Sequence, residues 1–385
     1  MIAEEVRLYK RNIFMVWTDV KKAYDSIQQR YIIRILVLLE VPEWIINFIK
    51  QAMKSWRTKL QMIIKDGMVV TDVIKIVCGI FQGDSLSPLL FCLSYLMVSV
   101  ILRKKRLGYI PGPPGKRNVH HMKSHFIFMD DFKGLTSTES SLKAIIDIST
   151  EILEEIGLEI GLDKCAVLKV NKGKIIQMDG IDLSVGGIIQ SVDINSSYSY
   201  LGIMELLDPC HSDVKEEIIS KMTKVANIVW GSELDEKNKV DAHNMLVVSK
   251  LTYSFGIINW TQSELDDIDR KLRKCISKYN CLNIHSNTNR LYLARKNGGR
   301  GLINIHHLFN RAIVSLVGYI FNANSEHAKL IKEYWVCKKK GTLLKKAEDI
   351  IENLKLNISF TANGMKKGGN IIHHKMVGSV MKKEY

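Results

Sequence analysis

The sequence predicts an α+β protein, in which a sheet with helices is followed by a helical region. In the first half, short apolar runs rich in aromatic and β-branched residues alternate with segments of helical periodicity. From about His211 onward only helical periodicity continues, which places a domain boundary near Pro209. We therefore expect a sheet domain over residues 1–205, a helical domain over 206–325 and a basic, frayed tail over 326–385.

The charge of the chain narrows the choice of partners. The 385 residues carry a formal net charge of +15, with 46% hydrophobic and 25% charged residues. The composition is ordinary for a folded protein with a substantial core, but the charge favours a polyanionic partner or an anionic surface. The seven cysteines are scattered without close pairing, so no disulfide framework is expected and a reducing compartment fits.

The elements of the first half can be assigned in order. The run from Ile13 to Val20 predicts a buried strand, and residues 28–40 and 42–53 have helical spacing. Residues 58–80 predict two strands around the turn Lys65-Asp66-Gly67. The apolar run over 87–102 is too short to span a bilayer comfortably and contains serines and a proline, so it predicts a buried helix. Residues 139–157 predict an amphipathic helix ended by glycine.

Carboxylates stand at the ends of two apolar runs. Asp19 follows the first predicted strand, and Asp130 and Asp131 form the turn of a hairpin in "FIFMDDFKGL". If these strands are neighbours, three carboxylates meet, and their repulsion calls for divalent cations with a preference for oxygen ligands, Mg²⁺ or Mn²⁺. The alternative is an exposed acidic turn and an unrelated aspartate.

Five ordered motifs together resemble the reverse transcriptases of non-LTR (LINE-type) retrotransposons. They are "DVKKAYDS" from Asp19, "GIFQGDSLSPLLF" from Gly79, "FIFMDD" from Phe126, "GLEIGLDKC" from Gly157 and "YSYLGI" from Tyr198. The later segment "NRLYLARKNGGRGL" is similar to a signature in one branch of these elements. The resemblance extends to about residue 320, and five ordered motifs are far more specific than any one.

The resemblance implies a polymerase palm of antiparallel strands with partial fingers, then a helical thumb. It also implies an RNA-directed DNA polymerase that extends a primer 3′-hydroxyl with two Mg²⁺ ions, or Mn²⁺. The implied partners are an RNA template, a DNA primer, the RNA/DNA hybrid and dNTP substrates, with a nuclear location. No membrane association is expected, and the oligomeric state stays open.

The same resemblance implies roles for individual residues. Asp19, Asp130 and Asp131 would be metal ligands, Asp131 the least direct, and Lys164 would lie near the triphosphate as a general acid. The ring of Tyr24 would lie beneath the incoming sugar and exclude a 2′-hydroxyl. The other implied contacts are the nucleotide site (Val20, Gln82, Gly83, Ser85), the primer grip (Tyr200, Leu201, Gly202) and the nucleic-acid backbone (Arg270, Lys271, Arg273, Lys274, Lys278).

Alternative interpretations remain for several of these residues and for the whole chain. Tyr24 could be a core aromatic, Lys164 a solvated surface charge, and residues 270–280 a solvated basic face. Only about twenty residues precede Asp19, so we expect that most of a fingers region is missing and that the element is truncated at its N-terminus. The alternative function is a catalytically inactive remnant that at most binds nucleic acid.

Overall fold

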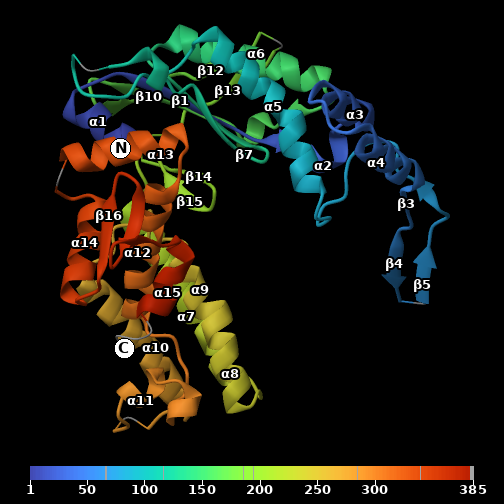
Figure 1. The fold of residues 1–385 in the computed structure, drawn as a ribbon. Helices are drawn as coiled ribbons and strands as arrows, with labels where there is room; N and C mark the ends of the chain where they lie inside the picture. Colours follow the sequence, from blue (N-terminus) through green and yellow to red (C-terminus); the bar gives the residue numbers. More distant parts are fainter. Residues whose placement is uncertain are drawn as a thin grey trace. The chain divides into compact units, whose positions relative to one another are not determined.

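The computed structural model has two compact units. It describes residues 1–65, 67–115, 117–184, 186–193, 195–283, 285–338 and 340–381. One unit comprises Ile2–Asp208, here the N-terminal unit, and the other comprises Met1 with Pro209–Tyr385, here the C-terminal unit (Figure 1). Sheet and helix are mixed in the first unit and helices dominate the second, so the expected α+β class is confirmed.

The N-terminal unit contains six α-helices and two 3₁₀ turns within its described residues. They are α1 (Ile2–Leu8), α2 (Ala23–Ser26), α3 (Gln29–Leu38), α4 (Glu43–Ser55), α5 (Ser87–Lys105), α6 (Glu139–Glu155), η1 (Val119–His121) and η2 (Leu162–Lys164). Its strands are β1 (Ile13–Thr18), β2 (Val20–Lys21), β3 (Arg57–Thr58), β4 (Gln61–Ile64), β5 (Gly67–Val70), β6 (Ile74–Lys75), β7 (His125–Phe128), β8 (Asp131–Thr136), β9 (Glu159–Ile160), β10 (Ala166–Asn171), β11 (Lys174–Ile176), β12 (Ile181–Asp182), β13 (Ile188–Ile189), β14 (Tyr198–Tyr200) and β15 (Ile203–Glu205).

A five-stranded antiparallel sheet forms the centre of this unit, in the order β11-β10-β1-β8-β7. Every residue of β1 is buried, because both faces of the sheet are covered. Phe14 and Val16 pack in the core formed with α3, α5 and α6. Ile13, Met15 and Trp17 pack on the opposite face, where side chains from other segments cover them. The continuous apolar run of β1 is the sequence signature of a strand buried on both faces.

Several local assignments made from the sequence are confirmed. Helices α3, α4 and α6 lie where helical spacing predicted them, and the side chain of Thr138 caps α6 by accepting a hydrogen bond from the Ser141 N–H. Gly157 ends this segment with a φ of +85°. Strands β4 and β5 pair as the predicted hairpin, although Asp66 in its turn lies outside the described residues.

Helix α5 belongs to the core of the N-terminal unit. By length and composition alone it could cross a membrane, so the expectation that this run is too short to span a bilayer comfortably is wrong, and 39% of its most apolar window is buried inside the protein. Its buried side chains include Phe91, Tyr95 and Val98, and it contacts α3 and α6. The prediction of a buried helix at this position therefore agrees with its packing.

The C-terminal unit consists mainly of helices, with one small sheet. Its elements are α7 (His211–Gly231), α8 (Glu236–Ala242), the π-helix η3 (His243–Val248), α9 (Ser249–Thr252), α10 (Gln262–Lys278), α11 (Asn289–Tyr292), η4 (Arg295–Asn297), α12 (Ile305–Asn322), α13 (Glu326–Lys338), α14 (Leu343–Asn353), β16 (Ile358–Thr361), β17 (Gly364–Lys367), β18 (Asn370–Ile371), η5 (His374–Met376) and α15 (Val377–Met381).

The expectation of a frayed tail over 326–385 is wrong for its described residues. Helix α14 buries Leu344, Ala347 and Ile350 on one face, and it contacts α12. Met365 in β17 is fully buried, and β17 also contacts α12. The prediction rested on the high lysine content of this segment. Its apolar residues, however, recur at helical spacing and form a face that packs against the rest of the unit.

His243, at the start of η3, gives the C-terminal unit a pH dependence. Its Nδ1 accepts a hydrogen bond from Trp230 Nε1 at 3.0 Å, and burial lowers the pKa of His243 to about 4. Below the ordinary pKa of 6.5 the unfolded chain binds a proton that the folded chain does not bind until about pH 4. The folded state therefore loses about 3 kcal/mol of stability from this group as the pH falls through that window.

We expect His243→Asn to remove this contribution, because an amide oxygen still accepts from Trp230 but does not titrate. The measurement is the free energy of unfolding in urea at pH 7 and at pH 4.5, for both proteins. The variant is expected to lose less stability than the wild type between the two pH values. Equal losses would show that His243 is not held neutral by burial.

Candidate active site

The register of two neighbouring strands brings two aspartates face to face. Trp17 of β1 pairs with Lys133 of β8, and Thr18 pairs with Phe132. The next position along this register sets Asp19 opposite Asp131. Because side chains alternate between the faces of a sheet, both carboxylates lie on the Trp17 face, away from α6. The sheet therefore brings together the two acidic segments that the sequence marked separately.

Asp130 joins this pair through a tight turn. Phe128 of β7 pairs with Asp131 of β8, so Met129 and Asp130 form a two-residue loop. Met129 has a φ of +56°, a conformation that usually requires glycine in such a turn. A strained backbone conformation of this kind is typical of functional sites, where placing a side chain outweighs the loss of folding stability.

Asp131 is affected by the charges of the other two aspartates. The pKa of Asp131 is raised, first by burial and then by the negative charges of Asp130 and Asp19. The ammonium of Lys164 lies 3.4 Å from Asp19 Oδ2 and is itself well exposed. One cation thus partly balances a cluster of like charges.

Backbone contacts hold Lys164 at this position. Strand β9 pairs with β2, with Ile160 opposite Val20, and the Gly161 N–H donates to the Asp19 carbonyl at 2.9 Å. Lys164 follows in the 3₁₀ turn η2, and the Lys164 N–H donates to the Gly161 carbonyl. The lysine motif is therefore attached directly to the backbone of the first aspartate.

Tyr24 lies between the core and the carboxylates. Its ring stacks on Phe91 of α5 with centroids 5.2 Å apart, and its hydroxyl lies 3.8 Å from the Met129 sulfur. The pKa of Tyr24 is raised by burial and then by the charge of Asp130. One face of the ring is packed and the residue is partly exposed, so it is not a fully buried core aromatic.

The loop after Gly79 is fixed against the Tyr24 segment. The Ile80 N–H donates to the Tyr24 carbonyl at 2.7 Å, and a Cβ on Gly79 would lie 2.6 Å from the Asp25 carbonyl oxygen. Only glycine allows this approach. Sequence reasoning overlooked Gly79 and selected the exposed residues that follow it, Gln82, Gly83 and Ser85.

The hairpin formed by β14 and β15 has Leu201 and Gly202 at its tip, after Tyr200. Both tip residues have positive φ, +49° for Leu201 and +73° for Gly202. They form a tight two-residue turn whose backbone twist matches the twist of the two flanking strands. At its base, the Glu205 carboxylate accepts hydrogen bonds from Trp17 and Lys133. Sequence reasoning missed these last three residues, because nothing in the pattern pairs residues so far apart.

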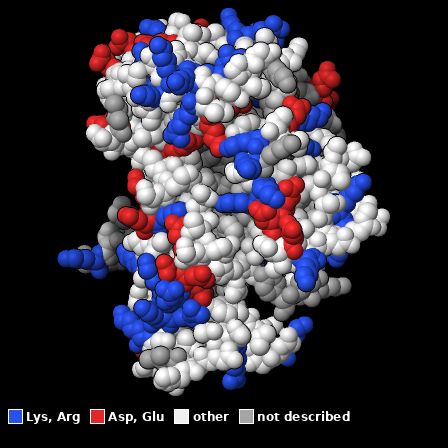
Figure 2. Space-filling model, turned by 90° about the vertical axis from the view of Figure 1, so that its left-hand side faces the viewer, with Lys and Arg blue, Asp and Glu red and all other residues white. Residues whose placement is uncertain are grey.

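The cations of α10 are less available than their spacing suggests. Arg270 pairs with Asp267 at 2.9 Å and Arg273 with Asp269 at 3.4 Å. Lys278 contacts Asn227 and the ring of Tyr279, whereas Lys271 and Lys274 are exposed. On the face drawn in Figure 2, Lys and Arg side chains gather in several groups with Asp and Glu between them. On this face the positive charge is therefore divided among several groups.

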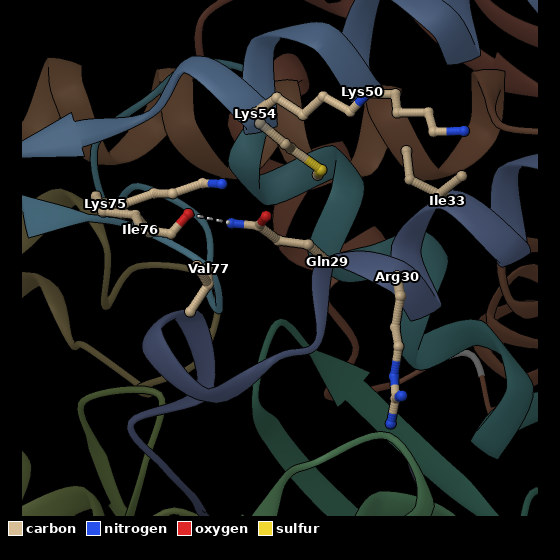
Figure 3. A pocket seen from close by; sticks show the side chains of 9 residues that line it. Gln29, Arg30, Ile33, Lys50, Lys54, Lys75, Ile76 and Val77 are labelled. Carbon is tan, nitrogen blue, oxygen red and sulfur yellow. Dashed lines mark hydrogen bonds between the residues drawn. The ribbon is translucent and has the colours of Figure 1, made fainter.

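A basic pocket of about 430 Å³ lies between α3, α4 and β6, and sequence reasoning did not predict it. It is lined by Gln29, Arg30, Ile33, Lys50, Met53, Lys54, Lys75, Ile76 and Val77. In Figure 3, Gln29 donates to the Ile76 carbonyl, and Arg30 points away from the three lysines. Four cations and no acidic side chain line the pocket, but they come from separate segments that no single motif connects.

The aspartates fit a divalent cation by the chemistry of their donors. They offer only oxygen atoms, which Mg²⁺ and Mn²⁺ prefer, and a bound cation would relieve the repulsion that raises the pKa of Asp131. Across the described residues, no three His, Cys, Asp or Glu side chains lie close enough together to hold a metal ion as they stand, so a bound cation would have to draw the carboxylates closer. Asp19, Asp130 and Asp131 are each partly exposed to solvent.

Comparison with known proteins identifies the family. A family model described as reverse transcriptase (RNA-dependent DNA polymerase) matches residues 3–204, more than half of the chain. The Pol polyprotein of a type-1 retrotransposable element R2 from Nasonia vitripennis is 23% identical over 346 residues, covering 88% of this chain and 32% of that protein. The polyprotein of the type-2 element R2DM from Drosophila melanogaster is 22% identical, covering 76% and 27%.

The chain thus spans between about a quarter and a third of the length of these curated relatives. Among solved structures, an apo telomerase from Candida tropicalis aligns with 85% of this chain and 55% of its own at 14% identity, with a TM-score of 0.38. The family match covers the whole five-stranded sheet and the three aspartates Asp19, Asp130 and Asp131. The chain belongs to the reverse transcriptase (RNA-dependent DNA polymerase) family, and its relatives place it with the non-LTR retrotransposon enzymes.

Proposed function

We propose that this chain is an RNA-directed DNA polymerase that extends a primer 3′-hydroxyl with dNTPs on an RNA template. The observation that carries the proposal is the register that sets Asp19 opposite Asp131, inside a domain of the reverse transcriptase family. The excess of positive charge supports partners with phosphate backbones. A nuclear location follows as part of this proposal.

Asp19, Asp130 and Asp131 would hold Mg²⁺, with Mn²⁺ as an alternative. When bound, such cations lower the pKa of an attacking hydroxyl and neutralise charge on a leaving pyrophosphate. Lys164 supplies an exposed ammonium beside Asp19, where it can bind a triphosphate and donate a proton to pyrophosphate. Tyr24 presents a ring next to Asp130, and that ring would exclude a ribose 2′-hydroxyl.

One observation favours the second candidate, a nucleic-acid-binding protein without catalysis. Lys164 already provides a positive charge beside Asp19, and the carboxylates of the described residues do not lie close enough together to hold a metal ion as they stand. In that case phosphate binding would persist without nucleotidyl transfer. Substitution of the aspartates separates the two candidates.

We predict that Asp19→Asn or Asp130→Asn abolishes primer extension and leaves hybrid binding intact, because shape is kept and cation affinity is lost. The assay is extension of oligo(dT) on poly(rA) with Mg²⁺ and dTTP, alongside filter binding of the hybrid. Asp25→Asn is the matched control, since Asp25 is exposed on the neighbouring turn of helix. Full extension by either variant would contradict the metal-ligand role.

For Tyr24, we predict that Tyr24→Val incorporates ribonucleotides markedly better relative to deoxynucleotides. The smaller side chain opens space for the 2′-hydroxyl without altering the carboxylates. The measured quantity is the ratio of ribonucleotide to deoxynucleotide incorporation, so a general loss of stability cancels. Tyr24→Phe keeps the ring and should keep the wild-type ratio. An unchanged ratio in Tyr24→Val would identify Tyr24 as packing against Phe91 only.

The cations of α10 should differ in their contribution to hybrid binding. We expect Lys271→Ala with Lys274→Ala to reduce the slope of log affinity against log salt by roughly 2, if each lysine contacts one phosphate. Arg270→Ala with Arg273→Ala should change the slope less, because both guanidinium groups are paired with aspartates. Titration of the hybrid at several salt concentrations measures both slopes. Equal slopes in all three proteins would show that α10 does not contact the phosphates of the hybrid.

A further inference from the structure

A buried charge joins the β14–β15 hairpin to the strands that carry the aspartates. Glu205, the last residue of β15, is 9% exposed and is one of few charged residues buried in the described chain. Its Oε1 atom accepts hydrogen bonds from Trp17 Nε1 at 2.8 Å and from Lys133 Nζ at 2.5 Å. A buried carboxylate destabilises the folded state unless it stays hydrogen-bonded and paired with a cation. The folded state therefore favours conformations in which Glu205, Trp17 and Lys133 remain in contact.

The two donors occupy informative positions. Trp17 and Lys133 pair directly across β1 and β8. Trp17 lies two residues before Asp19, and Lys133 lies two residues after Asp131. Since side chains alternate, all four project from the same face of the sheet. One carboxylate from the hairpin therefore binds a cross-strand pair of residues, each of which lies two positions from one of the aspartates.

A second set of contacts fixes the other strand of the hairpin. Tyr198, which pairs with Glu205, stacks on Trp17 with centroids 5.1 Å apart. Its hydroxyl donates to the Lys164 carbonyl at 2.6 Å. The Lys133 ammonium also lies 5.2 Å from the centre of the Tyr200 ring. Both strands of the hairpin thus contact the segments that hold Asp19, Asp131 and Lys164.

We propose that the Glu205 carboxylate, held by Lys133 and Trp17, is a positioning group that sets where the hairpin tip presents a primer terminus to the aspartates. This inference rests on the proposed function, since the hairpin resembles the primer grip. Because the turn at Leu201 and Gly202 is tight and the strands are short, the position of the hairpin base determines the position of its tip. An ion pair specifies direction and register, whereas apolar packing at the same place would tolerate sliding.

A purely structural role is the competing explanation, and a double variant separates the two. Replacing a buried ion pair by apolar residues of similar size often preserves stability, whereas removing one partner does not. The variants are therefore Glu205→Gln and the double variant Lys133→Met with Glu205→Gln, because the glutamine amide oxygen still accepts from Trp17 Nε1 while the ion pair is lost. The matched control is Lys169→Met, because Lys169 also pairs with a glutamate, Glu139, and lies over an aromatic ring on the same sheet.

The experiment uses the full chain and a poly(rA)/oligo(dT) hybrid whose primer ends in a photoreactive 4-thiothymidine. Hybrid affinity, unfolding midpoint and the map of cross-linked residues are measured for each protein. We expect wild type and Lys169→Met to cross-link at residues 200–202. The double variant should keep its midpoint and affinity but lose these cross-links, with kcat/KM for the primer reduced roughly tenfold or more. Glu205→Gln should show an intermediate change.

Two results would overturn the inference. One is a double variant with the wild-type cross-link map, which would make the Glu205 contact structural only. The other is a wild type that binds the hybrid without cross-linking at residues 200–202. Because cross-linking requires no synthesis, it decides the inference even if no protein extends the primer, a result that would instead contradict the proposed polymerase function.

Discussion

The antiparallel pairing of β1 with β8 is the constraint on which the rest of the N-terminal unit depends. A shift of one residue would turn Asp19 or Asp131 to the opposite face, into the apolar core around α6. Every residue of β1 is buried and four of the six residues of β8 are buried, so this register is strongly specified. The apolar packing of the sheet therefore keeps this register even though it places negatively charged carboxylates close together.

The segments around the aspartates are attached to this pair of strands. The Gly161 N–H donates to the Asp19 carbonyl, and Lys164 is held close by as a result. Gly79 allows the following loop to approach the Tyr24 helix. Glu205 attaches the hairpin at its base. Each attachment uses a backbone or buried polar contact, which fixes position more narrowly than apolar packing does.

The sequence predicted much of this arrangement for identifiable reasons. Periodicity located α3, α4 and α6, and the ends of apolar runs located Asp19 and Asp131. It could not predict that Lys133 meets Glu205, because that contact depends on strand register and hairpin docking. The frayed tail was a wrong prediction because lysine content concealed the packing face of α14. The pairing of Arg270 and Arg273 with aspartates likewise depends on side-chain geometry.

Binding of Mn²⁺ followed by electron paramagnetic resonance tests the central claim, that strand register builds a cation site, most directly. The wild type should remove free Mn²⁺ from solution, and Asp19→Asn and Asp131→Asn should each weaken that binding, because the two carboxylates share one face. Asp25→Asn should bind as the wild type does. Equal Mn²⁺ binding by all four proteins would contradict the claim that these two strands form the site.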